Sequence, residues 1–235
     1  MTSPSAPLPQ AVLWDLDGTL IDSEPLWMAA EGELMAAHGL GWSDEQGRAM
    51  VGNALPVSAG LMQEAGLPLG LREIIDTLID AVMQGLRENV PWRPGVRELM
   101  EALGEAGVPQ ALVTMSERPM ADAVMQGLGS SPFSVVVTGD AVERGKPDPE
   151  PYLKALDELA QQHPGVSAAG SLALEDSVPG TSSALAAGLV TVGVPLHVPL
   201  TERDGLILLP TLAGVTPQEL GCLVQLAQQA GEPQG

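Results

Sequence analysis

The chain has 235 residues, of which 45% are hydrophobic, and its 30 acidic residues against 10 Lys and Arg give a formal net charge of −20. This composition supports one large domain or two unequal ones around a sizeable buried core, and it excludes global disorder. The negative charge argues against nucleic acid and anionic membranes as partners, and an aromatic content of 3% argues against base stacking.

The cysteine content and the first residues bear on the compartment. A single cysteine, Cys222, excludes an internal disulfide and a cysteine-based metal cluster. Cys222 lies in an apolar helical pattern, which predicts a buried side chain. With no apolar run near 18 residues and no secretory signal, we expect a cytoplasmic protein without a membrane partner. Residues 1–10, rich in Pro and Ser, are expected to form a disordered lead-in.

Short apolar runs of strand length alternate with helical patterns along most of the chain. The first strand, over 11–14, is followed by a helix start at 22–25 and by a stretch, 25–91, that is predicted to be mostly helical. The alternation predicts an α/β fold, with a Rossmann-like parallel sheet and helices on both faces. The later predicted strands cover 110–113, 133–137, 171–174, 190–194 and 206–209, and the later predicted helices cover 96–106, 119–128, 149–162 and 180–187.

The helical stretch interrupts this alternation directly after the first strand. Alternation resumes only after the break at Arg93-Pro94-Gly95. The stretch is therefore interpreted as an insertion. We predict a core domain over 11–24 and 92–230 and a helical cap domain over 25–91.

Acidic side chains stand where two of the predicted strands end. Asp15 and Asp17 follow the strand over 11–14, and Glu175 and Asp176 follow the strand over 171–174. Ligands of open α/β sheets bind outside the carboxyl ends of the strands, and carboxylates two residues apart in extended chain point to one side. Such a group favours a hard divalent cation. Each acidic pair taken alone is more typical of an ordinary turn or strand end than of a metal site.

A hydroxyl and a cation add to this pattern. Thr114 follows the strand over 110–113, where a hydroxyl beside loop N–H groups suits a phosphate oxygen. Lys146 is one of few cations, and Pro147 fixes the backbone after it. Alone, each residue also fits a plain turn or an exposed side chain. Acids for a cation, a hydroxyl for phosphate and a Lys for negative charge are together the inventory of phosphoryl transfer.

These segments resemble the motifs of the haloacid dehalogenase-like hydrolases. Residues 15–25, Asp-Leu-Asp-Gly-Thr-Leu-Ile-Asp-Ser-Glu-Pro, closely match the first motif; Thr114 matches the second, Gly145-Lys146-Pro147 the third and Glu175-Asp176 the fourth. Order and spacing agree over roughly residues 11–195. The chain is most similar to the β-phosphoglucomutase-like subgroup, in which a small helical cap is inserted after the first strand.

The resemblance implies a Mg²⁺-dependent phosphatase that acts on a small phosphorylated metabolite, and it implies a role for each matched residue. Asp15 would be the nucleophile, which gives an aspartyl-phosphate, and Asp17 the general acid and then the base. Lys146 would neutralise charge on the phosphate and on Asp15. Glu175 would reach the metal through water, and Asp17 would bind it by its backbone carbonyl. The implied phosphate-binding residues are Thr114, Met115, Ser116 and Lys146, and the implied metal ligands are Asp15, Asp17, Glu175 and Asp176.

Phosphatase and sugar-phosphate mutase both remain open, because the two reactions use the same core. Mutases of this subgroup typically carry a His shortly after the first motif, where this chain has Trp27. They also carry a cap Arg that grips a second phosphate, where this chain has Leu55. Arg72, Arg87 or Arg93 could replace that Arg, so the exclusion is partial. We favour the phosphatase.

The sequence says less about the substrate. Trp27, Gly52 and Asn53, on the cap, are candidates for lining the pocket, and Arg118 is a candidate after the second motif. Core packing for Trp27, a plain loop position for Asn53 and a solvent-facing Arg118 remain alternatives. A catalytically silent, metabolite-binding relative is a further hypothesis, although every catalytic position is chemically intact. We expect a monomer or a weak homo-oligomer.

Overall fold

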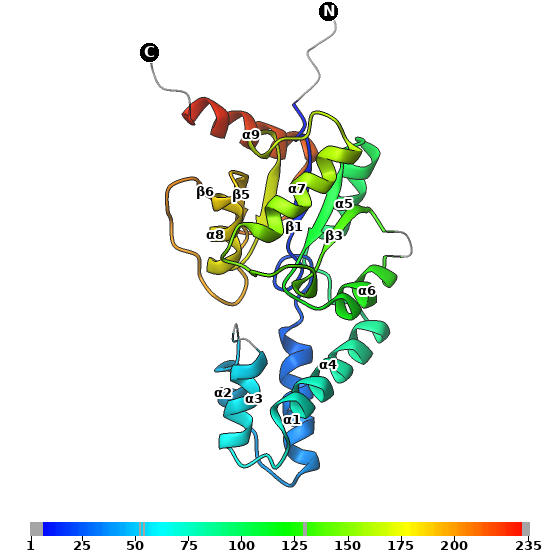
Figure 1. The fold of residues 1–235 in the computed structure, drawn as a ribbon, viewed down its shortest axis with the longest axis vertical. Coiled ribbons are helices and arrows are strands. Elements are labelled where there is room, and N and C mark those ends of the chain that lie inside the picture. Colours follow the sequence, from blue (N-terminus) through cyan, green and yellow to red (C-terminus); the bar gives the residue numbers. More distant parts are fainter. Residues whose placement is uncertain (1–6, 52, 54, 129–130, 232–235) are drawn as a thin grey trace, which may run out of the picture. The chain divides into compact units, whose positions relative to one another are not determined.

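A computed structural model of the chain describes residues 7–51, 53, 55–128 and 131–231 (Figure 1). The chain divides into two compact units, which we call the core unit and the helical unit. The core unit comprises Met1–Ile21 and Trp92–Gly235, and the helical unit comprises Asp22–Pro91. Within the described residues, no helix combines the length and the apolar character that crossing a bilayer requires.

The core unit is built on a sheet of six described strands, in the order β3-β2-β1-β4-β5-β6. Every neighbouring pair runs parallel, which places the carboxyl ends of the strands at one edge. The predicted α/β fold is confirmed. The strands are β1 (Val12–Trp14), β2 (Gln110–Val113), β3 (Phe133–Val137), β4 (Leu172–Glu175), β5 (Val190–Gly193) and β6 (Leu206–Leu208).

Helices cover both faces of this sheet, because the central strands are apolar on both sides. On one face Leu13 of β1 belongs to a buried cluster with Tyr152. On the other face Trp14 donates its indole N–H to Gln110 Oε1 at 3.0 Å, and Gln110 Nε2 donates to the Met100 carbonyl at 2.9 Å. The helices of the core unit are α5 (Val96–Glu105), α6 (Arg118–Gln126), α7 (Glu150–Gln162), α8 (Val178–Ala186) and α9 (Pro217–Gly231), with 3₁₀ turns at Gly139–Ala141 and Ala168–Gly170.

The helical unit packs around its longest helix, α4. Ile74, Leu78, Val82 and Leu86 recur every four residues on α4 and are buried, which predicts about 1.5–3 kcal/mol of stabilisation for each side chain. Helices α1 and α3 both pack against α4, and α2 packs against α1. The helices are α1 (Glu24–Ala37), α2 (Asp44–Arg48), α3 (Leu55–Glu64) and α4 (Leu71–Glu88).

The prediction that Cys222 is buried is wrong, and the predicted disordered lead-in over residues 1–10 lies outside the described residues from 1 to 6. Within residues 7–10, Gln10 donates its N–H to the Gly170 carbonyl at 2.8 Å and accepts two bonds from Ser167. Composition alone does not reveal these long-range contacts. Cys222 is exposed, because α9 turns Leu220 and Val224 inward and position 222 falls on its outer side.

Candidate active site

The candidate site lies at the carboxyl ends of three neighbouring strands, β2, β1 and β4. Asp15 follows β1 and donates its N–H to the Leu174 carbonyl of β4 at 3.0 Å. Thr114 follows β2 and donates its N–H to the Val137 carbonyl at 2.9 Å. Glu175 is the last residue of β4. The sheet order thus gathers at one edge three segments that lie far apart in the sequence.

Lys146 joins these segments through its ammonium group. Its Nζ lies 2.6 Å from Asp15 Oδ1, 2.6 Å from Glu175 Oε1 and 2.8 Å from the Val113 carbonyl. All three N–H donors of the ammonium are therefore used. Burial opposes the charge of Lys146, but the carboxylates of Asp15 and Glu175 outweigh it and raise the pKa of Lys146. The side chain is a fixed cation at any ordinary pH.

The acidic cluster carries more negative charge than Lys146 balances. Ligand atoms of Asp15, Glu175 and Asp176 all lie within 4.8 Å of one another. Burial, and then the charge of Glu175, raises the pKa of Asp15 to about 7. Burial, and then the charges of Asp15 and Glu175, raises the pKa of Asp176 to about 8. Carboxylates crowded in this way repel one another when they ionise. A hard divalent cation bound among their oxygens relieves that repulsion, so this donor set suits such an ion.

The first-motif turn closes directly on this cluster. Gly18 has a φ of +82°, and a Cβ there would collide with the Asp176 carboxylate, so both the conformation and the space require glycine. Buried Arg93 donates to the Gly18 carbonyl and, at 2.6 Å, to the Val194 carbonyl. Its Nη2 reaches the Pro195 carbonyl at 3.2 Å. Arg93 is one of the arginines predicted to replace a phosphate-gripping Arg, whereas in the structure its guanidinium binds backbone carbonyls.

The loop after β2 lies beside the acids. Thr114 is buried, and its Oγ1 accepts the Ser116 N–H at 2.9 Å. Ser116 Oγ donates to Asp17 Oδ2 at 2.5 Å, which ties this loop to the first motif. Met115 Sδ accepts the backbone N–H of Lys146 at 3.2 Å. Two of the three predicted phosphate-binding residues of this loop, Ser116 and Met115, therefore contact the segments of Asp17 and Lys146, and Thr114 is linked to them through Ser116.

Tyr152, which sequence reasoning missed, also reaches the cluster. Glu175 is fully buried; its Oε1 accepts from Lys146 and, at 2.8 Å, from the Tyr152 hydroxyl. Its Oε2 accepts the Asp176 N–H and the Ser177 hydroxyl, each at 3.2 Å. One feature of the sequence could have drawn attention to Tyr152 as a candidate site residue: it is the only tyrosine of the chain. Arg93 gave a similar signal as a cation beside the break at residues 93–95.

The described members of the predicted substrate set are exposed or half-buried. Trp27 is half-buried on α1, and Asn53 is exposed, with its Nδ2 donating to the Ala49 carbonyl at 3.2 Å. Gly52 lies outside the described residues. Arg118, at the start of α6, is exposed and pairs with Asp122 at 2.8 Å. Arg72 pairs with Asp76 in the same exposed manner, and Arg87 is exposed.

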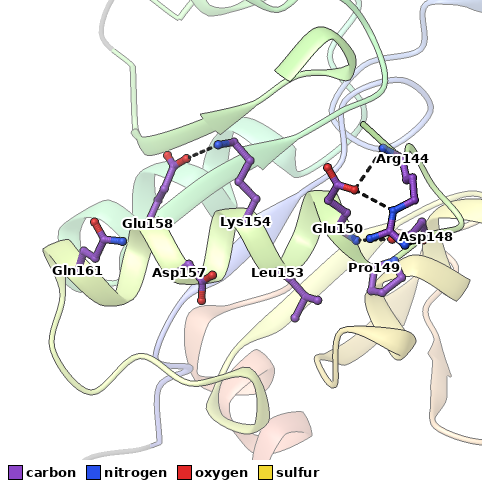
Figure 2. Close-up of a pocket in the computed structure, with 9 residues that line it drawn as sticks. All are labelled: Arg144, Asp148, Pro149, Glu150, Leu153, Lys154, Asp157, Glu158 and Gln161. Atoms are coloured by element: carbon purple, nitrogen blue, oxygen red, sulfur yellow. Dashed lines mark hydrogen bonds and ion pairs between the residues drawn. The ribbon is translucent and has the colours of Figure 1, made fainter. Parts of the chain in front are cut away.

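A surface groove of about 590 Å³ runs along the outward side of α7 and is separate from this cluster (Figure 2). Figure 2 shows its cations already paired: Arg144 contacts Asp148 and Glu150, and Lys154 lies 3.1 Å from Glu158. None of the predicted site residues lines this groove. The acidic cluster, not the groove, is the candidate active site.

Comparison with known proteins agrees with this geometry. Residues 12–194 match the family model of the haloacid dehalogenase-like hydrolases. The chain belongs to this family. The match begins at β1 and ends just after β5, so it covers five of the six described strands of this hydrolase and the whole range of the helical unit.

Two curated relatives of this hydrolase are phosphatases. It is 29% identical to the phosphorylated carbohydrates phosphatase of Thermotoga maritima, over 90% of this chain and 96% of the relative. It is 35% identical to the N-acetylmuramic acid 6-phosphate phosphatase of Pseudomonas aeruginosa, over 79% and 81%. Its fold resembles the crystal structure of CbbY from Rhodobacter sphaeroides in complex with phosphate, with a TM-score of 0.75, 28% identity and coverage of 88% and 96%.

Proposed function

We propose that this hydrolase is a Mg²⁺-dependent phosphatase of a small phosphate monoester, most simply a sugar phosphate. The observation that carries the proposal is Lys146, which bridges Asp15 and Glu175 at the strand edge where Asp17 and Asp176 also lie. A phosphate dianion binds beside so many carboxylates only when cations offset the repulsion. The relatives named as phosphatases of carbohydrate phosphates support the substrate class.

The residues present fit a bound metal ion. Asp15 and Asp176 would bind it through their carboxylates, and Asp17 through its backbone carbonyl. Glu175 would contact it through water, because its two oxygens already accept four bonds from the protein. When bound, Mg²⁺ would supply positive charge against the phosphoryl oxygens and fix their orientation.

The protein side chains would carry the bond changes in two steps. In the first, a carboxylate oxygen of Asp15 bonds to phosphorus, the ester P–O bond breaks, and Asp17 gives its proton to the leaving oxygen. In the second, Asp17 takes a proton from a water molecule, and the oxygen of that water attacks the phosphorus of the aspartyl-phosphate. The bond between Asp15 and phosphorus breaks, which releases phosphate and restores the Asp15 carboxylate. Lys146 holds Asp15 Oδ1 in place and balances the phosphoryl charge.

The remaining site residues would position the substrate. Thr114, Met115 and Ser116 would receive the phosphoryl oxygens, and Ser116 would also orient Asp17 through the bond of 2.5 Å. The helical unit would act as the cap domain, with Trp27, Gly52 and Asn53 as candidate contacts for the organic part. Arg118 would contribute only by leaving its ion pair with Asp122.

Phosphate release with Mg²⁺, measured across sugar phosphates, nucleotides and small phosphoesters, tests the proposal. We expect release from one or a few esters and its loss in excess EDTA. β-Glucose 1-phosphate belongs in the panel with products followed by NMR, because glucose 6-phosphate without free phosphate would establish a mutase. No turnover, together with no binding of a phosphate analogue at Asp15, would make the chain a silent metabolite-binding relative.

A further inference from the structure

We propose that the Tyr152 hydroxyl is a positioning group for this reaction, which sets the place of the Lys146 ammonium by way of Glu175. This inference rests on the proposed function and concerns how its cation is held. Tyr152 would touch neither the substrate nor the metal. Its effect would be passed through one shared atom, Glu175 Oε1.

The geometry of that atom carries the argument. Glu175 Oε1 accepts the Tyr152 hydroxyl at 2.8 Å and Lys146 Nζ at 2.6 Å. The Tyr152 ring also lies near the ammonium, with Lys146 Nζ 5.1 Å from the ring centroid, which is cation–π range. Tyr152 is completely buried on the inward side of α7, where Ala155, Leu156 and Leu159 are its buried helix neighbours. One side chain therefore contacts both members of the Lys–Glu pair.

The rest of the Glu175 carboxylate is held too tightly to adapt. Oε2 accepts the Asp176 N–H and the Ser177 hydroxyl. Gly180 of α8 packs so closely that a Cβ there would collide with the carboxylate. If the Tyr152 hydroxyl is removed, Glu175 therefore cannot turn toward another donor among these neighbours. Oε1 then has Lys146 as its one remaining donor, and its hydrogen bond with the Lys146 ammonium becomes stronger.

The consequence for Lys146 follows from its own contacts. Its three donors are divided among Asp15, Glu175 and the Val113 carbonyl. A stronger hold by Glu175 draws the ammonium away from Asp15, and a weaker one lets it follow Asp15. The Tyr152 hydroxyl thus fixes how a single positive charge is shared between the proposed nucleophile and its partner acid. Supporting groups of this kind typically change activity by 10–100-fold when removed.

The test compares Tyr152→Phe with Ser171→Ala. Tyr152→Phe keeps the ring and removes only the hydroxyl. Ser171 lies just before β4, the strand that ends at Glu175, and its buried hydroxyl has no hydrogen-bond partner among the described residues. We expect Tyr152→Phe to lower kcat/KM by roughly tenfold and to weaken the binding of inorganic phosphate severalfold, measured by calorimetry with Mg²⁺. Ser171→Ala should leave both values within twofold.

A double-mutant cycle with Lys146→Met separates positioning from a structural role. If Tyr152 acts only by positioning Lys146, adding Tyr152→Phe to Lys146→Met should lower kcat/KM by less than twofold, because there is no ammonium left to position. A full tenfold loss in both backgrounds, or no loss in either, overturns the proposal. Should the wild type hydrolyse no ester, the proposed function fails, whereas phosphate affinity still decides whether Tyr152→Phe differs from Ser171→Ala.

Discussion

The core unit and the helical unit hold their polar side chains in different ways. In the core unit, residues more than 100 positions apart meet at 2.6 Å, as Lys146 and Asp15 do, and their side chains are only 4% and 10% exposed. In the helical unit, the described polar contacts are mostly short-range and exposed, such as Asn53 to the Ala49 carbonyl. The proposed chemistry therefore depends on long-range contacts at the sheet, whereas the unit proposed to meet the organic part of the substrate holds its described polar side chains mostly by local contacts.

The largest expected effect comes from a substitution in the core unit, at the proposed nucleophile. Asp15→Asn should lower turnover by roughly 10⁴-fold or more, because an amide is a poor nucleophile for phosphorus. Single-turnover phosphate release would measure it, with urea unfolding as the control for folding. Activity within tenfold of the wild type would contradict an aspartyl-phosphate mechanism.

Asp17→Asn should come next, with a loss of roughly 10²–10⁴-fold that affects both half-reactions. Ser116→Ala offers a matched variant, because it removes the hydroxyl that contacts Asp17 at 2.5 Å and leaves the carboxylate. We expect a smaller loss for Ser116→Ala, on the order of tenfold. If both variants kept wild-type rates of leaving-group release in rapid-quench experiments, Asp17 would not be the general acid.

The same contrast explains which parts could be predicted from the sequence. Each strand is a short apolar run, and the acids stand at strand ends, so parallel alternation places Asp15, Thr114 and Glu175 at one edge. The contacts of Tyr152 and Arg93 depend on how a helix and a loop pack across the sheet, and no local pattern encodes such packing. The same limit explains Cys222, whose helix has apolar residues on more than one side.

A moderate effect tests the helical side of the comparison. Trp27→Ala should raise KM for a sugar phosphate by about tenfold, if the half-buried indole covers the organic part of the substrate. The KM for 4-nitrophenyl phosphate, which has no sugar, serves as the internal reference. Equal changes for both substrates, together with a lower unfolding midpoint, would assign Trp27 to packing within the helical unit.

The smallest effect concerns Glu31, a buried carboxylate of α1 that the proposed chemistry does not use. Trp42 donates its indole N–H to Glu31 Oε2 at 3.3 Å. Burial raises the pKa of Glu31 to about 7, the indole bond opposes this, and the charge of Glu24 adds to it. Because the folded chain keeps this proton while the unfolded chain loses it near pH 4.5, the free energy of unfolding falls as the pH rises from about 4.5 to 7.

Glu31→Gln should remove that dependence, because the amide has no proton to lose. We expect the variant to be more stable than the wild type at pH 8, by on the order of 1–2 kcal/mol, and to match it near pH 4.5. Urea unfolding of the full chain at several pH values measures the difference, with exposed Glu33→Gln on the same helix as the control. A difference that stays constant with pH would mean that Glu31 is ionised in the folded chain. The helical unit would then hold a buried charge as firmly as the core unit does, and the contrast between the two units would fail.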